Sequence, residues 1–284
     1  MSHRSPPLAW LLDWLRRDRR AALSLAFLLL LVLVSLAAPW IAPHSPTEQD
    51  LANTLAVPGA EHWLGTDDLG RDIFSRLLYG ARVAIYASTL SVAIAVLLGV
   101  PVGILAGYLG GWVDTLVSRM IDTFLAFPAI VLAIAVTGAL GIGLTNGMIA
   151  VGIVFAPQLA RIARARTLVV RQELYVDAAR CFGASTRHIL WRHVLPNSLQ
   201  PVIVQVTILL AAALLAEASL SFLGLGIQAP DPSWGAMLAR AYQSMEMSPD
   251  QMYAPGLAIL ATALAFNSLG EALRKELDPT NSRL

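Results

Sequence analysis

Long, nearly uncharged apolar runs restrict the fold of this chain more than any other feature of its sequence. A helix needs about 20 mostly apolar residues to cross the hydrocarbon layer of a membrane. The stretch 123–160 holds no charged residue and is too long for one span, so we expect it to divide within the glycine-rich segment 138–147. The predicted spans then lie at 21–41, at 83–105, on either side of 138–147, at 198–216 and at 252–270. The sequence therefore predicts an all-α, polytopic membrane protein with about six transmembrane helices.

The distribution of arginine predicts the orientation of these spans. Charged residues are only 14% of the chain, against about 25% in a typical soluble domain, and positive ones collect on the cytoplasmic side of a membrane. Arginines cluster before the first span, between the fourth and fifth spans and after the sixth, and they are scarce in 43–80 and 222–251. We expect both termini and the loop between the fourth and fifth spans to be cytoplasmic, which agrees with an even number of spans.

The same pattern divides the chain into five parts. Residues 1–20 are predicted to form a cytoplasmic arm, and 21–42 the first transmembrane helix, retained as an anchor because no small-residue cleavage site interrupts it. Residues 43–80 are predicted as an outer segment with a short amphipathic helix at the interface, where Ile73, Leu77 and Leu78 recur at helical spacing. A five-helix core follows at 81–273 and includes a cytoplasmic loop at 166–197. Residues 274–284 form a cytoplasmic tail.

The cytoplasmic loop has a pattern of small residues at fixed spacing. Small side chains in the middle of a helical face let another surface approach closely, and Gly183 suits the left-handed residue that ends a helix. We expect Ser185 to cap a second short helix that Pro196 ends, and Asn197 with Gln200 to form a capping box for the fifth span. The spaced residues are Asp177, Ala178, Ala179, Gly183, Leu195 and Pro196. The loop is therefore predicted to be two short helices joined by a glycine elbow that receives a partner.

This spacing resembles the cytoplasmic-loop motif of bacterial ABC importer permeases, which reads Glu-Ala-Ala, three residues, Gly, nine residues, Ile, one residue, Leu-Pro. Here Asp177 stands in place of Glu and His193 in place of Ile. The segments 64–82 and 217–235 are similar to the outer segment and the fifth-helix exit of dipeptide and oligopeptide permeases, and the resemblance extends over 20–279. The chain is identified as a member of that family, in its second, or C-type, subunit.

The resemblance implies a set of partners for a non-catalytic subunit. They are a related second permease subunit beside this chain, two ABC ATPase subunits that bind ATP and Mg²⁺, and an external solute-binding protein. The chain itself then lacks a cofactor, lies in the bacterial inner membrane in contact with lipid and binds no nucleic acid. Closure of the ATPases would act on the loop, and solute would pass between the two permeases. Dipeptides, oligopeptides, glutathione and nickel chelates remain open as cargo.

Several classes of function lack the residues that they need. A P-loop requires lysine in Gly-x-x-x-x-Gly-Lys, and the single lysine, Lys275, follows Ala-Leu-Arg, so ATP hydrolysis must come from a partner. Cys181 is the only cysteine and the histidines lie outside the predicted spans, so we expect no metal site and no intramembrane hydrolase. A self-sufficient secondary transporter usually shows repeat symmetry and midplane carboxylates, neither of which we find. A non-transport scaffold would leave the loop spacing unexplained.

Two acidic residues are candidates for the substrate path. Glu217 is embedded in an apolar run, where acids are often functional, although it could equally stabilise a helix end. Asp122 either pairs with Arg119 or faces the cavity entrance, and we favour the pair.

Overall fold

The computed structural model describes residues 14–277, and within this range it contains helices and loops but no β-strand. Five helical segments are long and apolar enough to cross a membrane, and a sixth crossing results if one bent pair of helices counts as a single span. The five are α2 (Arg19–Ile41), α3 (Ile73–Leu109), α6 (Leu144–Val170), the continuous segment Thr186–Phe222 and the segment Pro249–Leu277, which contains α11 (Tyr253–Leu277). The prediction of an all-α membrane protein with about six spans is confirmed.

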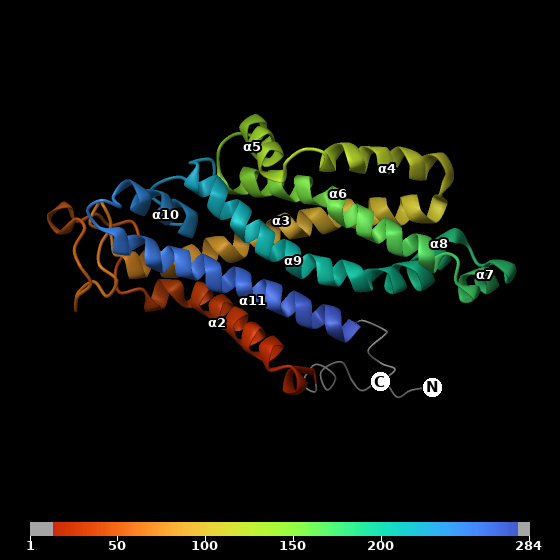
Figure 1. Ribbon diagram of the computed structural model, residues 1–284, viewed down its shortest axis with the longest axis horizontal. Coiled ribbons are helices and arrows are strands. Elements are labelled where there is room, and N and C mark those ends of the chain that lie inside the picture. The colour runs from red at the N-terminus through yellow and green to blue at the C-terminus, as the bar shows by residue number, and fades with distance from the viewer. Residues whose placement is uncertain (1–13, 278–284) are drawn as a thin grey trace.

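The long helices run roughly parallel to one axis, and the two ends of the bundle differ (Figure 1). One end, here called the loop end, holds residues 42–72, residues 223–233 and helix α10 (Trp234–Gln243). The other, here called the α7 end, holds α7 (Leu174–Cys181) and α8 (Thr186–Ile189). Ala21 at the start of α2 packs with Ala272 near the end of α11. The start of the first span and the end of the last span therefore lie at the same end of the bundle, as an even number of spans requires.

A stripe of glycines lets α3 and α6 pack closely in the centre of the bundle. An added Cβ at Gly99 would collide with the carbonyl oxygen of Ala156, and one at Gly103 with that of Ala160. Gly107 continues the stripe one turn later. Small residues spaced four apart let membrane helices approach until their backbones touch. The resulting van der Waals contact stabilises the helix pair, because the hydrophobic effect contributes little to helix association within lipid.

The third predicted span is wrong in its boundaries. It consists of α4 (Gly111–Leu125) and α5 (Ala129–Leu140), which meet at a 93° bend. Pro128 is the physical reason for the break, because proline disfavours helical geometry in the residue before it and cannot donate to the preceding turn. The expected helix start at Thr123 therefore lies near the end of an amphipathic helix rather than at the beginning of a span.

Other predicted boundaries also require correction. The segment around Ile73 is no separate interfacial helix but the first two turns of α3, which Asp72 caps by accepting a hydrogen bond from the Ser75 backbone at 2.7 Å. Helix α6 continues to Val170, so the loop predicted to begin at 166 starts later. The predicted tail begins inside α11, which extends to Leu277, whereas residues 278–284 and most of the predicted arm, residues 1–13, lie outside the described range.

The loop end is ordered by helix α10 and the segment that precedes it. Trp234, at the first turn of α10, donates from Nε1 to the backbone oxygen of Leu77 at 3.0 Å, and its ring lies against Gly80. Gln251, before α11, donates to the backbone oxygen of Thr66 at 3.1 Å. These contacts join three distant parts of the chain, so the segment between α2 and α3 is fixed by tertiary contacts although its described helix is only the short turn Leu51–Asn53.

Candidate functional site

The loop predicted to receive a partner folds as a helical hairpin at the α7 end (Figure 1). Its elbow is a Schellman motif, in which the backbone N–H of Ala184 donates to Ala179 and that of Gly183 to Arg180, both at 3.0 Å. Gly183 has φ +75°, the left-handed conformation that disfavours other residues. Ser185 accepts a hydrogen bond from the His188 backbone at 3.3 Å and caps α8. The predicted glycine elbow and serine cap are confirmed.

One face of the hairpin anchors it to the bundle. Val176 on α7, Ile189 on α8 and Val194 in the next turn are buried and belong to the core cluster that α3, α6 and α9 (Leu195–Phe222) share. Ala179 and Ala184 pack against the same cluster. A movement imposed on the hairpin would therefore be transmitted to the membrane helices through a continuous packed contact.

The opposite face of the hairpin presents apolar side chains to solvent. Leu174 is 84% exposed and Phe182 is 91% exposed, and Ala178 lies between them at helical spacing. Asp177 pairs with Arg180 at 3.1 Å on the same short helix, and both side chains are about half exposed. Desolvation raises the pKa of Tyr175, and the charge of Glu173 adds to this shift, so its phenol stays neutral. The outer face of α7 thus offers an apolar stripe beside the Asp177–Arg180 pair.

The predicted end of the second helix at Pro196 is wrong. A π-helical turn, Leu190–Val194, joins α8 to α9, and the backbone N–H of Leu195 donates to Leu190. The wider turn makes room for Pro196, whose ring would otherwise clash with the carbonyl one turn earlier. Asn197 forms no capping box but donates from Nδ2 to the His193 backbone oxygen at 2.7 Å. The hairpin is therefore joined to the fifth span through one continuous helix, Thr186–Phe222.

Glu217 lies in a sealed contact between α9 and the start of α10. Its side chain is 1% exposed, and Ser221 donates a hydrogen bond to its carboxylate at 2.7 Å. The hydroxyl of Ser233, which also caps α10, is a second partner of the carboxylate, and Ser221 in turn accepts from the backbone of Ile227. This network ties the turn after α9 to the helix itself, which corresponds to the helix-end alternative for Glu217.

We expect Glu217→Gln to be nearly normal and Glu217→Leu to be destabilised, because only the amide can still accept from Ser221. Leaving buried hydroxyls without an acceptor costs about 1–3 kcal/mol. The measurement is the thermal midpoint and yield of the purified complex, alongside solute uptake. Normal assembly with abolished uptake in Glu217→Gln would contradict this assignment and place Glu217 in the substrate path.

Asp122 is paired, but not with the residue that its position in the sequence indicated. Its carboxylate lies 2.6 Å from Nη2 of Arg161 on α6, and both side chains are more than half exposed. The expected pair with Arg119 is therefore wrong. Asp122 and Glu217 lie on different helices, α4 and α9, and the structure brings neither of them to the hairpin.

The sequence reasoning missed the basic residues that hold α4 and α6 together at the α7 end. Arg164 on α6 forms a bidentate pair with Asp114 in the first turn of α4, and its Nη2 lies 2.8 Å from Oδ2. Arg171 donates to the backbone oxygen of Gly107 at 2.9 Å, at the end of α3, where a cation is favoured by the helix dipole. The available signal in the sequence was Asp114, which lies three residues after the pair Gly110–Gly111. These arginines, assigned to a cytoplasmic loop, are structural.

A groove with a volume of about 430 Å³ lies between α5, α6 and α9. It is mainly apolar, and its lining includes Ala133, Val154, Phe155, Leu215 and Ser219. Neither Glu217 nor Asp122 lines it.

Comparison with known proteins assigns the family. Residues 99–283 match the family described as binding-protein-dependent transport system inner membrane component, and residues 10–58 match the N-terminal transmembrane domain of oligopeptide transport permease C. The glutathione transport system permease protein GsiD of Shigella flexneri serotype 5b is 45% identical over 265 residues, which are 93% of this chain and 88% of that protein. GsiD of Escherichia coli O157:H7 has the same identity and coverage.

Solved structures agree at the level of the fold. Two inward-facing crystal forms of the MetNI methionine ABC transporter have TM-scores of 0.58 and 0.59 at 19% sequence identity, and the matches cover 72% of this chain and 96% and 98% of those chains. The family models and the relatives that are 45% identical confirm the predicted family. The chain belongs to the binding-protein-dependent transport system inner membrane components, as a multi-pass permease subunit of the dipeptide and oligopeptide type of ABC importer in the bacterial inner membrane.

Proposed function

We propose that this chain forms half of the path of a small-peptide importer and couples it to ATP hydrolysis through the α7–α8 hairpin. ATPase and substrate-binding proteins are the partners of this family of permeases. In the complex that we propose, one related permease subunit lies beside this chain and two ATPase subunits bind at the α7 end. ATP and Mg²⁺ are bound by those ATPases, and this chain uses no cofactor of its own.

The observation that carries this proposal is the exposed apolar face of a firmly anchored hairpin. Leu174 and Phe182 are exposed in and directly after α7, the helix that lies at one end of the bundle (Figure 1). Clustered apolar side chains on a surface mark a protein interface. The buried residues on the inner face, Val176 and Ile189, and the unbroken helix into α9 supply the mechanical link. A partner that shifts the hairpin would tilt α9 and α6 together.

The groove between α5, α6 and α9 supports the second half of the proposal. It opens on a face of the bundle where small side chains such as Ala133 and Ser219 allow a second helical subunit or a solute to approach. The related permease is expected to cover this face and to close the path.

Glutathione is the cargo that the relatives favour. Proteins that are 45% identical to this chain over 93% of its length are named as permeases of a glutathione transport system. The test is uptake of labelled glutathione, a dipeptide and a nickel chelate by cells that carry the complete transporter in place of their own importers. We expect glutathione to be taken up and to compete with the dipeptide. Exclusive uptake of the nickel chelate would overturn the peptide assignment.

Cys181 provides a direct test of orientation. The structure describes it as an exposed free thiol beside the elbow. A membrane-impermeant maleimide should label it in inside-out vesicles stripped of ATPase and leave it unlabelled in intact cells, because the hairpin is proposed to be cytoplasmic. Cys181→Ser is the control without a thiol. Strong labelling from outside the cell would contradict the predicted topology.

A further inference from the structure

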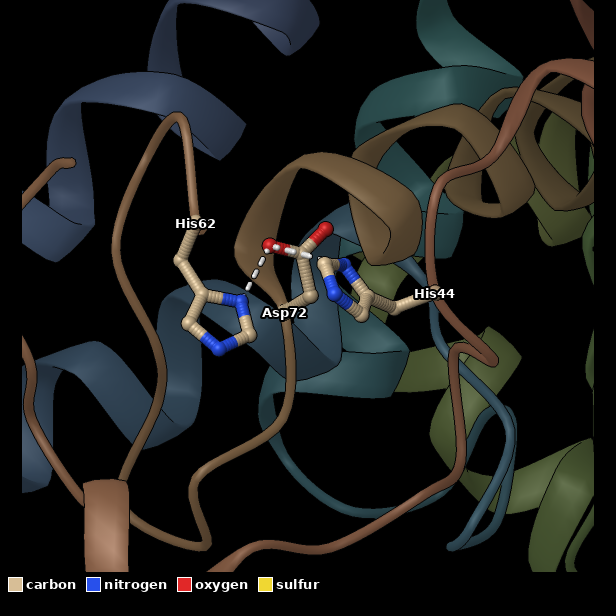
Figure 2. A group of neighbouring side chains, drawn as sticks. All are labelled: His44, His62 and Asp72. Atoms are coloured by element: carbon tan, nitrogen blue, oxygen red, sulfur yellow. Dashed lines mark hydrogen bonds and ion pairs between the residues drawn. The ribbon is translucent and has the colours of Figure 1, made fainter. Parts of the chain in front are cut away.

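Two histidines and an aspartate from distant positions meet at the loop end. His44 follows α2, His62 lies in the segment before α3, and Asp72 is the N-cap of α3. Figure 2 shows the two imidazole rings on either side of the Asp72 carboxylate. Nδ1 of His62 lies 3.0 Å and Nδ1 of His44 lies 3.9 Å from the same oxygen, Oδ1. One atom from each of the three residues lies within 4.8 Å of the others.

The hydrogen bonds of this cluster leave ligand atoms unused. Asp72 accepts from the backbone of Ser75 through Oδ2, so its Oδ1 remains to face both rings. Nδ1 of His44 is buried and has no hydrogen-bond partner among the described residues. A buried polar atom without a partner is unfavourable, and two imidazoles that share one carboxylate oxygen are more than a helix cap requires.

We propose that His44, His62 and Asp72 bind one Zn²⁺ ion that fastens the segment between α2 and α3. Two imidazole nitrogens and one carboxylate oxygen form a ligand set that zinc uses with water in the fourth position, whereas Mg²⁺ and Ca²⁺ select oxygen ligands. A tetrahedral zinc ion holds its ligand atoms roughly 3.4 Å apart, and the two distances to Oδ1 lie on either side of this value.

Binding requires only local movement. The three ligand atoms lie within 4.8 Å of one another, so the two histidine nitrogens must approach by up to about 1.4 Å to bind one ion. His44 can supply this movement, since a third of its side chain is exposed and its position is held through its backbone N–H, which donates to Ser75 Oγ at 3.1 Å. Asp72 is buried and fixed as a cap, so it supplies the rigid side of the site.

The ion would close the chain between residues 44 and 72. This segment has little regular structure of its own, and its order depends on contacts such as the one between Gln251 and Thr66. A ligand that binds only the folded form stabilises it by mass action. Zinc is therefore expected to raise the thermal stability of the loop end without contacting the hairpin or the groove.

The experiment uses the complete transporter, purified through a tag without histidine, stripped with a chelator and dialysed against Zn²⁺. We expect the native complex to hold about one more zinc ion than His44→Gln or His62→Gln, and each substitution to weaken binding at least about tenfold. His44→Gln is expected to disturb the fold least, because His44 is held in place by its backbone N–H, which donates to Ser75 Oγ. Co²⁺ in place of Zn²⁺ should give the visible absorption of a tetrahedral site in the native complex but not in the His44→Gln and His62→Gln variants.

His188→Gln is the matched control. His188 and His193 form a second histidine pair, with ring centroids 5.8 Å apart, at the opposite end of the bundle. We expect this variant to bind zinc as the native complex does, and zinc to raise the thermal midpoint of both but not of the His44 and His62 variants. Equal zinc content in native and His44→Gln complexes would overturn the proposal, as would equal stabilisation by Mg²⁺.

Discussion

Replacing Gly183 by valine should abolish solute uptake while the chain still inserts in the membrane. The residue holds φ +75° at the elbow of the hairpin, and a left-handed conformation costs a non-glycine residue about 1–2 kcal/mol. An added Cβ meets nothing within 4 Å in this chain, so bulk at Gly183 acts on what docks there. We expect the ATPases to be lost on co-purification and uptake to fall at least about tenfold, which corresponds to ~1.4 kcal/mol of coupling.

Gly224 offers a matched control for backbone strain. It ends α9 in the same kind of Schellman motif, with φ +78° and open space around its Cβ position, but at the loop end. Gly224→Val should therefore suffer the same strain and keep its ATPases. Gly183→Asn should retain part of the uptake, since asparagine tolerates the left-handed conformation. Full uptake in Gly183→Val would refute the coupling role, and equal loss of ATPase in both valine variants would assign the effect to strain.

Phe182→Asp should be the second most damaging change. Phe182 is 91% exposed at the tip of α7 and has the character of an aromatic anchor for a partner. Loss of such an anchor costs about 2 kcal/mol or more, so ATPase affinity should fall by roughly thirtyfold. The measurement is the ATPase concentration that restores half-maximal peptide-stimulated hydrolysis in vesicles containing the permease.

Two substitutions define the specificity of this effect. Tyr242→Asp places the same charge on an exposed aromatic position at the loop end and should leave ATPase affinity unchanged. Val176→Asp places it on the buried inner face and should reduce the amount of folded permease instead. An unchanged ATPase affinity in Phe182→Asp would show that the outer face of the hairpin is not the docking surface.

The hairpin elbow was predictable because its signals are local. A helix that ends in a left-handed residue needs glycine at one position, and Ser185 sits where the next helix needs a cap. The membrane class was predictable for a similar reason. Each span must form all its backbone hydrogen bonds within its own helix inside the bilayer, and it therefore appears in the sequence as a continuous apolar run.

The junctions between elements were less predictable. Pro196 and Asn197 carry the local signature of a helix boundary, yet a π-helical turn absorbs the proline and the helix continues. At Pro128 a break does occur, within a run whose hydropathy shows no interruption. The same residue type ends one helix and not the other because neighbouring packing decides whether a widened turn can be accommodated.

The sequence by itself determined that this chain crosses a membrane several times, where its glycine elbow lies and which family it joins. These properties follow from apolar length, backbone conformation and fixed local spacing. Only the tertiary structure decided that Asp122 meets Arg161, that Glu217 meets Ser233 at the start of α10, and that His44 and His62 face the same carboxylate oxygen of Asp72. Each of these contacts joins two segments that are distant in the sequence. Close packing sets how these segments are rotated and aligned relative to one another, as the glycine stripe of α3 does for α3 and α6. No property of a single segment determines this arrangement.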